Sequence, residues 1–175
     1  MTQRPTLTGI EQTFDENELI VSKTDLKGRI TYVNSVFLRV SGFEEHEVVG
    51  KAHNIIRHPD MPRGVFRLLW DTIQDEKELF CYVNNRCKNG DNYWVFAHVT
   101  PSYGIHGNVV GYHSNRRKPT ESALNIVKPI YDEMLAEERK HRLPHEQWGA
   151  SYPILLSKLE EIGKTYEEFI FDICM

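Results

Sequence analysis

The sequence contains few cysteines, no long apolar run and no excess of basic residues. Its three cysteines, at positions 81, 87 and 174, are too few and too irregularly spaced for a disulfide framework or a CxxC metal site, which predicts a reducing compartment. No stretch of about 18 apolar residues could cross a bilayer, and residues 1–18 lack the apolar core of a secretory signal. A net charge of −4 argues against a surface that binds nucleic acid. These absences predict a soluble, cytoplasmic protein that does not insert into membranes.

Motifs for catalysis and for metal binding are also missing. The sequence has no P-loop, no GxGxxG and no recognisable Ser/His/Asp order, so we expect no enzyme activity. Eight histidines are present, but their spacing matches no known ligand set. His141 and His145 are four residues apart, yet Pro144 interrupts the helix that would bring them to one face. We therefore expect no metal site made of side chains alone.

What is present is enough for one folded domain with a short appendage. Hydrophobic residues make up 40% of the 175 positions and charged residues 26%, so the chain can bury a core. Five segments read as strands from their β-branched and aromatic residues and their turn residues: 19–26, 29–33, 78–88, 92–100 and 108–117. Because the strands come as a pair and then a trio with short helices between, we expect an α+β domain with an antiparallel sheet and helices on one face.

Two short helices are predicted from capping residues. Asn34 precedes one helix and can accept from its first free N–H groups, and Gly42 suits a left-handed end. Asp60 comes shortly before Pro62 and is predicted to cap a second helix, whose apolar face covers residues 65–73.

The chain divides into three parts: an N-terminal arm over 1–17, a domain over 18–118 and a helical extension over 119–175. The arm is expected to be loose or partly helical. Residues 121–141 are predicted to form a helix that kinks or restarts at Pro129.

Residues 152–174 are predicted to form one further helix after a break at Pro144. Its apolar residues alternate spacings of four and three, which is an a/d register. Such a seam fits two arrangements: the helix packs on its own domain, or it pairs with another chain, either a second copy or a signalling partner.

The segment Arg57-His58-Pro59-Asp60 is the most suggestive for binding. An arginine fork beside a helix N-terminus can hold an anionic group, and Asp60 can accept from a hydroxyl or an amine. On residue types alone a structural interpretation is favoured, in which Asp60 only caps the helix and Arg57 only pairs with Asp60, since capping needs no ligand.

Three longer stretches resemble a PAS domain, and more narrowly the flavin-binding PAS domain of bacterial aerotaxis receptors. They are DLKGRITYVNSVFLRVSGF, GKAHNIIRHPDMPRGVFRLLW and VNNRCKNGDNYWVFAHVTP. The resemblance covers about residues 18–118 and is most specific in Arg-His-Pro-Asp-Met-Pro. It implies a PAS fold, with five antiparallel strands over short helices, that holds FAD without a covalent bond. The residues it implies for the cofactor are Asn34, His53, Arg57, His58, Asp60, Phe66, Trp70 and Asn85.

The hairpin at Asn89-Gly90 leaves the strand register open. A two-residue turn sets Asn85 opposite Trp94, whereas a three-residue loop with a bulge sets it opposite Val95. The resemblance favours the second, with Trp94, Phe96 and His98 on the outer face of the sheet.

The sequence also departs from the family's pattern. Where the family usually has Gly-x-Pro-Trp, this chain has Lys77-Glu78-Leu79-Phe80, without the tryptophan, and Cys81 stands where glycine is common, so the pocket is expected to be reshaped. The reactive cysteine of light-sensing flavin domains is absent from the comparable stretch, residues 50–54, which argues against adduct chemistry.

The function that the resemblance implies is redox sensing. No methyl-accepting or kinase region follows, so the chain is expected to pass the redox state of FAD to a separate signalling protein, of the aerotaxis or energy-taxis kind. Two alternatives remain: a haem-based gas sensor with His58 as the axial ligand, and a PAS module that binds partners without any cofactor.

Overall fold

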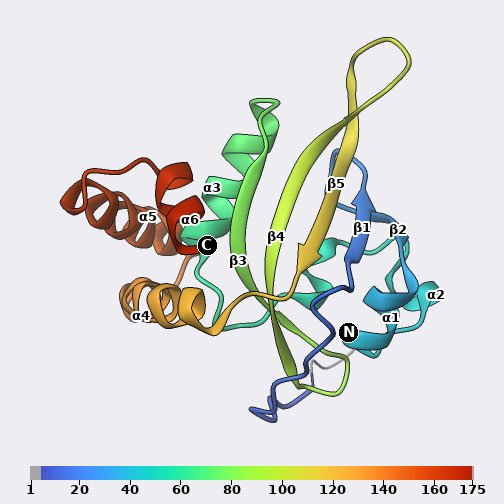
Figure 1. Ribbon diagram of the computed structural model, residues 1–175, viewed down its shortest axis with the longest axis horizontal. Coiled ribbons are helices and arrows are strands. Elements are labelled where there is room, and N and C mark those ends of the chain that lie inside the picture. The colour runs from blue at the N-terminus through green and yellow to red at the C-terminus, as the bar shows by residue number, and fades with distance from the viewer. Residues whose placement is uncertain (1–4, 175) are drawn as a thin grey trace.

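The computed structural model describes residues 5–174, and Figure 1 shows one sheet with α4, α5 and α6 beside its β3 edge and α1 and α2 near its β2 edge. The strands are β1 Ile20–Thr24, β2 Ile30–Val33, β3 Leu79–Arg86, β4 Asn92–Tyr103 and β5 Val109–Arg117. The helices are α1 Ser35–Ser41, α2 Glu45–Val48, the 3-10 helix η1 His53–Ile56, α3 Arg63–Gln74, α4 Glu121–Glu138, α5 Pro144–Glu161 and α6 Tyr166–Cys174.

The five strands pair antiparallel in the order β2-β1-β5-β4-β3. The α+β prediction and all five predicted strands are confirmed. Because β1 pairs with β5, the first hairpin joins the later trio at the centre of the sheet. This topology brings β1, β3, β4 and β5 to one continuous face, which η1 and α3 cover.

The tight turn between β1 and β2 depends on Gly28. Its φ is 72°, and a Cβ there would lie 3.0 Å from the ring of Trp70. Asp25 fixes the same turn, because its Oδ1 accepts from the N–H groups of Lys27 at 2.9 Å and Arg29 at 2.8 Å. The turn therefore needs glycine both for its backbone and for its contact with α3.

Helix α1 is capped as the sequence predicts. Asn34 Oδ1 accepts from the Phe37 N–H at 3.0 Å, and Gly42 ends the helix with φ 72°. The buried side chains of Phe37 and Val40 point into the core.

The start of α3 differs from the prediction. The helix begins at Arg63 after Pro62, and Asp60 makes no cap: its side chain lies half exposed, 3.2 Å from Arg139. The first N–H groups of α3 bond instead to Glu138 Oε1, at 2.6 Å from Arg63 N and 3.1 Å from Gly64 N. The carboxylate of Glu138, on a helix distant in sequence, thus caps α3 in place of Asp60.

The β3–β4 register also differs from both predicted alternatives, since Asn85 lies opposite Tyr93. The Cys87 N–H bonds to the Asp91 carbonyl at 2.7 Å, so the loop consists of residues 88–90, the Asn-Gly pair and the one residue before it. Trp94, Phe96 and His98 nevertheless lie on the outer face, as expected, because they pair with residues that alternate with Asn85.

The C-terminal extension forms α4, α5 and α6, and the predicted single helix over 152–174 is wrong. The predicted break before Pro144 is present, because α4 ends at Glu138, but the next helix begins at Pro144 itself and not at Tyr152, since proline is tolerated in the first helical turn. Gly163, with φ 65°, separates α5 from α6. Helix α4 is confirmed and contains Pro129.

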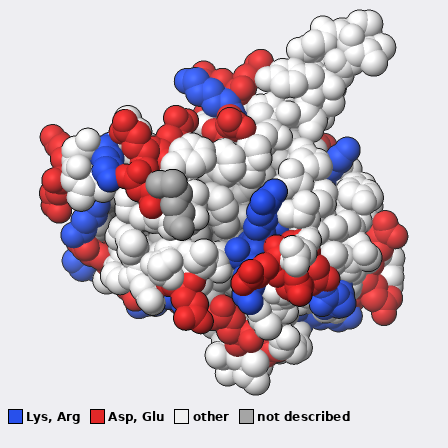
Figure 2. Space-filling model, in the orientation of Figure 1, with Lys and Arg blue, Asp and Glu red and all other residues white. Residues whose placement is uncertain are grey.

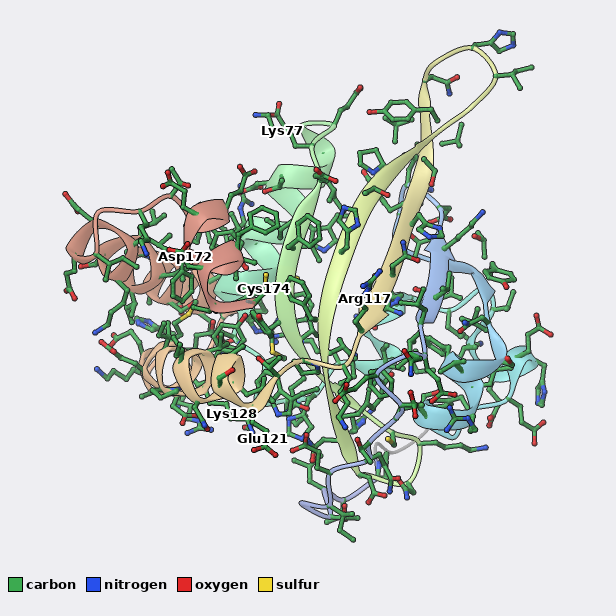
Figure 3. The ribbon with its side chains drawn as sticks, viewed as in Figure 1. Lys77, Arg117, Glu121, Lys128, Asp172 and Cys174 are labelled. Carbon is green, nitrogen blue, oxygen red and sulfur yellow. The ribbon has the colours of Figure 1, made fainter. Side chains whose placement is uncertain are left out.

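These helices pack on their own domain. Helix α5 lies against α3 and α4, and α6 lies against β3 and α4. Of the predicted seam, Leu155, Leu159 and Phe169 are buried within the chain, while Ile162 is exposed. Figure 3 shows Cys174, at the end of α6, beside β3. Pairing with another chain through this extension stays a prediction.

Residues 5–17 of the N-terminal arm are extended and bonded to the domain, which corrects the expectation of a loose or partly helical arm; positions 1–4 of that prediction lie outside the described residues. Thr8 N–H bonds to the Gly90 carbonyl at 3.1 Å, and Gln12 N–H bonds to the Asn92 carbonyl at 2.7 Å. Asp91 accepts from the side chains of Thr8 and Gln12. The arm therefore follows the β3–β4 loop.

The β4–β5 hairpin projects beyond the other strands and carries no charged side chain in Figure 2. Residues 98–115 contain no Lys, Arg, Asp or Glu. Among the helices described, none has the length and apolar character needed to cross a bilayer.

Candidate functional site

A cavity of about 300 Å³ lies between the sheet and the segment formed by η1 and α3. This volume is at the lower end of the range usual for small-molecule sites, about 300–1,000 Å³. Its apolar and aromatic lining consists of Gly28, Ala52, Ile56, Phe66, Leu69, Trp70, Ile73, Cys81, Val83, Ala97, Val99 and Tyr112. Its polar lining consists of Ser22, Thr24, Lys27, His53, Asn54, Arg57, Asn85, His113, Ser114 and Arg116.

One wall of the cavity is aromatic. Trp70 meets Tyr112 edge to face, with ring centroids 5.8 Å apart. The Arg57 guanidinium lies 4.6 Å from the centre of the Phe66 ring and donates to the Met61 carbonyl at 2.7 Å. Flat apolar surfaces of this kind suit a planar ring system as ligand.

The sheet side of the cavity holds a buried cation that the sequence analysis did not single out. Arg116, on β5, is 4% exposed. Its Nη2 donates to Ser22 Oγ and to His53 Nε2, each at 2.7 Å. Burial and the nearby Arg116 lower the pKa of His53 to about 3, so His53 is neutral and accepts from Arg116 at this nitrogen. Both partners are therefore neutral, and neither balances the charge of Arg116.

Several polar atoms on this side of the cavity lack partners within the described chain. They are Arg116 Nη1, Asn85 Nδ2 and Ser114 Oγ, all buried. Among residues 5–174, no Asp or Glu lines the cavity. Leaving a buried donor unpaired costs about 1–3 kcal/mol, and more for a charged group. The cavity thus offers unused donors and positive charge, which suit a ligand with carbonyl or anionic groups.

Five of the eight predicted site residues meet at this cavity: His53, Arg57, Phe66, Trp70 and Asn85. The strand register puts Asn85 on the cavity face, and a backbone bridge joins it to Arg57. The prediction that a strand asparagine and the arginine loop converge is therefore consistent with the geometry.

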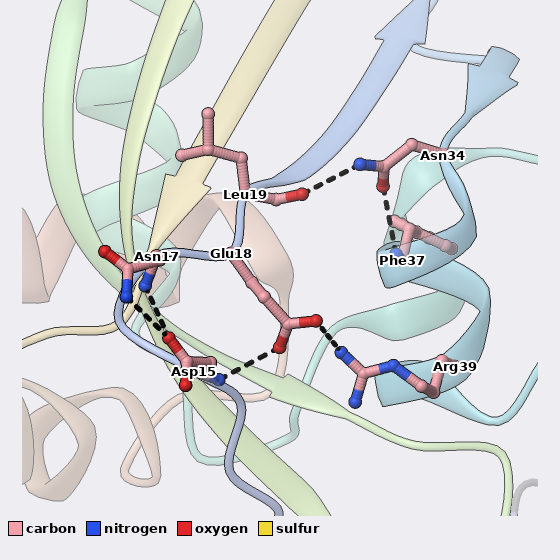
Figure 4. A network of polar contacts seen from close by, with 7 residues as sticks. All are labelled: Asp15, Asn17, Glu18, Leu19, Asn34, Phe37 and Arg39. Atoms are coloured by element: carbon pink, nitrogen blue, oxygen red, sulfur yellow. Dashed lines mark hydrogen bonds and ion pairs between the residues drawn. The ribbon is translucent and has the colours of Figure 1, made fainter.

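Asn34 lies outside the cavity lining. In Figure 4 its amide spans two segments: Nδ2 donates to the Leu19 carbonyl at 2.8 Å, and Oδ1 accepts from Phe37 N–H at 3.0 Å. Oδ1 also accepts from Val21 N–H at 3.0 Å. The nearby Glu18–Arg39 ion pair holds the same corner. Asn34 joins β1 to α1 and has a structural role here.

His58 and Asp60 also lie outside the lining. His58 is buried, and its Nδ1 accepts from the Asp60 N–H at 3.1 Å, a bond that needs the ring to be neutral at that nitrogen. Burial lowers the pKa of His58, in keeping with this bond. Because His58 does not face the cavity, a haem there has no axial ligand from this residue.

Cys81, one of the two departures from the family's pattern, lies in the cavity lining, whereas Leu79 is buried in the core. Burial raises the pKa of the Cys81 thiol to about 12, so the thiol is protonated near neutral pH and a poor nucleophile. The thiol therefore contributes shape and apolar surface to the cavity.

The outer face of the sheet carries a row of aromatic rings. Phe80 stacks on His98 with centroids 4.0 Å apart, and Phe171 of α6 lies 5.1 Å from Phe80. Phe96 lies 5.7 Å from Phe80. Of the three residues predicted on the outer face, Trp94 lies against Tyr131 of α4, with ring centroids 6.2 Å apart, and Phe96 and His98 lie against Phe80, which contacts α6.

Comparison with known proteins agrees with this geometry. Residues 30–116 match the family described as PAS fold. The chain is 35% identical over 143 residues to the aerotaxis receptor of Escherichia coli strain K12, covering 82% of this chain and 28% of the receptor. It is 26% identical to the blue-light-activated histidine kinase 1 of Erythrobacter litoralis, covering 65% of this chain and 31% of the kinase. The chain therefore spans about a third or less of these relatives.

Solved structures show the same fold. A light-oxygen-voltage domain from a study with a flavin analogue superimposes with a TM-score of 0.56 at 20% identity, covering 66% of this chain and 87% of the other. The light-state structure of the Aureochrome1 domain superimposes with a TM-score of 0.55 at 19% identity, covering 65% and 90%.

Proposed function

This chain belongs to the PAS-fold family, and from that premise we propose that it is a cytoplasmic, non-catalytic redox sensor. It holds FAD without a covalent bond in the cavity between the sheet and α3. It relays the state of the flavin to a separate signalling protein of the energy-taxis kind.

The observation that carries this proposal is the set of unpartnered buried donors in a cavity that aromatic rings also line. A flavin ring offers carbonyl oxygens and ring nitrogens along one edge, and a flat apolar surface over the rest. Arg116 Nη1, Asn85 Nδ2 and Ser114 Oγ are available to that edge. Phe66 and Trp70 are available to the flat surface.

The charges of the lining fit the rest of the cofactor. Lys27 is exposed at the cavity, and Arg57 lies beside Phe66, so both can offer positive charge to phosphate groups outside the ring site. A cavity of about 300 Å³ accommodates a ring system, and the remainder of a dinucleotide has to lie beyond it.

When bound, FAD supplies reversible reduction, which changes the charge and hydrogen-bonding capacity of its ring edge. The side chains that face this edge come from β3 and β5, through Asn85 and Arg116. A change in the hydrogen bonds of Asn85 and Arg116 to the ring edge therefore alters the positions of β3 and β5, and the C-terminal helices pack on this sheet through α6 and β3. The proposal of a signalling role is supported by the likeness to the aerotaxis receptor.

The experiment is the absorption spectrum of the full chain purified from cells, with chromatographic identification of any released cofactor. The proposal expects flavin bands between about 370 and 450 nm and close to one FAD per chain. A Soret band would identify a haem protein. A colourless protein that does not take up added FAD would identify a cofactor-free PAS module, and either result overturns the proposal.

A further inference from the structure

Helix α3 is shared between the cavity and the C-terminal extension. On one side it lines the cavity with Phe66, Leu69, Trp70 and Ile73. On another side it packs against α5, which lies beside it in Figure 1. Any shift of α3 therefore changes the cavity and the extension together.

The start of α3 is held by a buried carboxylate from the extension. Glu138, the last residue of α4, is 5% exposed. Its Oε1 accepts from the N–H groups of Arg63 at 2.6 Å and Gly64 at 3.1 Å, and from the Ser151 hydroxyl at 2.6 Å. One oxygen atom thus joins α3, α4 and α5. Its negative charge is stabilised by the positive end of the α3 dipole.

The residues around this carboxylate are closely packed. A Cβ on Gly64 would lie 2.6 Å from Ser151 Oγ and 2.9 Å from Met134 Cε. Arg63 Nε donates to Gln147 Oε1 at 2.5 Å. The first turn of α3 is therefore enclosed by α4 and α5, and it cannot move without moving them.

No side chain next to α3 in sequence replaces this cap, because Pro62 occupies the cap position and makes no side-chain bond. We propose that Glu138 is a positioning residue that fixes α3 against the cavity and couples occupancy of the cavity to the C-terminal helices. The identity of the occupant rests on the proposed function, but the contact itself does not. Coupling between two sites is reciprocal. If ligand binding favours the packed position of the C-terminal helices by a given factor, a change that releases these helices weakens ligand binding by up to the same factor.

The tryptophans of the chain provide the readout. Trp70 lines the cavity, and Trp148 lies on α5, with its ring centre 4.5 Å from the Arg67 guanidinium. Incorporation of 5-fluorotryptophan and fluorine NMR give each site a separate resonance, assigned by replacing each tryptophan with phenylalanine.

The test variant is Glu138→Gln, which keeps the shape and one acceptor but loses the charge. The Trp70 resonance is expected to shift although Glu138 is not part of the cavity lining, and Glu138→Ala shifts it further. FAD affinity is expected to fall about fivefold to tenfold, at the lower end of the range of coupling energies between sites. In the wild type, FAD shifts the Trp148 resonance, and this response shrinks in Glu138→Gln.

The matched control is Glu137→Gln, one residue earlier on α4. Glu137 is partly exposed and pairs with Lys140, so this variant loses a carboxylate but not the contact with α3. It is expected to match the wild type in all three measurements. If Glu138→Gln does not fold, Ser151→Ala removes one of the three donors, leaves both backbone bonds in place, and is expected to give the same changes at smaller size.

The proposal is overturned if Glu138→Gln, or Ser151→Ala in its place, leaves the Trp70 resonance, the FAD affinity and the Trp148 response unchanged. If FAD shifts no resonance in the wild type, the proposed function fails instead. The positioning role is then decided by the ligand-free Trp70 resonance alone: a shift in Glu138→Gln supports it, and no shift refutes it.

Discussion

Arg116→Met should separate binding from stability. The variant keeps a long side chain in the cavity wall but removes the buried positive charge. A hydrogen bond from a charged donor contributes about 1.5–3 kcal/mol, which corresponds to a loss in FAD affinity of about 10- to 150-fold. Arg116 Nη1 has no partner in the described chain, so this loss concerns the ligand and not an internal contact.

The stability of the ligand-free protein should respond differently. Burial of Arg116 lowers its pKa, which shows the cost of holding the charge there. Removing an uncompensated buried charge recovers a desolvation penalty of several kcal/mol, while the lost bonds to Ser22 and His53 cost about 1 kcal/mol each. We expect the free energy of unfolding to stay within about 1 kcal/mol of the wild type or to rise.

Two measurements decide this prediction: urea unfolding of the ligand-free protein, and titration of FAD followed by its fluorescence. Arg117→Met is the matched control, because Arg117 is exposed on the neighbouring position of β5, on the outer face of the sheet in Figure 3. It should change neither quantity. A variant at Arg116 that keeps full FAD affinity and loses more than about 3 kcal/mol of stability would show that Arg116 is only a core residue.

Three further predictions concern residues around the cavity. The folded-state pKa of His53, about 3, lies below its ordinary value of 6.5, so the unfolded state takes up a proton first. The contribution of His53 to the free energy of unfolding is complete above pH 6.5 and falls by up to about 1.4 kcal/mol per pH unit as the pH drops toward 3. In urea unfolding from pH 7 to 4, the free energy of unfolding should therefore depend less steeply on pH in His53→Gln than in the wild type. Asn34→Ala should cost about 1–3 kcal/mol of unfolding free energy through its lost bonds to backbone, without lowering the FAD content of the folded fraction. Asp60→Ala should change stability by less than about 1 kcal/mol, because it loses only an exposed ion pair with Arg139; a larger loss in thermal unfolding would restore it as a cap.

Local features of the fold were predictable from the sequence because they depend on neighbouring residues. The cap at Asn34 and the left-handed end at Gly42 involve bonds within a few positions. The Asn89-Gly90 pair indicated the hairpin, but the register required the position of the loop, which the Cys87–Asp91 bond sets. A shift of one residue there decides which neighbours Asn85 faces.

Long-range contacts were beyond such reasoning. Nothing near α3 in sequence indicates that Glu138, 75 residues away from Arg63, supplies its cap. Gly163 was a usable signal for the end of α5, because glycine favours helix ends, but the continuing a/d spacing outweighed it. The packing of α5 on α3 then follows from tertiary contacts alone.

Arg116 shows how a site residue can be missed. The alternation of β5 puts Tyr112, Ser114 and Arg116 on one face. Because arginine is almost never fully buried without a partner, an arginine on the inward face of a central strand indicates a candidate binding residue. The sequence analysis instead weighted the loop around Asp60, whose side chain lies half exposed at the surface. Burial, which sequence motifs do not report, separates the two.

The most direct test of the central claim is a crystal structure of the full chain with FAD. We predict the flavin ring in the cavity beside Phe66 and Trp70, with Arg116 Nη1 and Asn85 Nδ2 each within hydrogen-bonding distance of the ring edge. A ring bound elsewhere, or a cavity in which these two nitrogens bond only to water, would contradict the account.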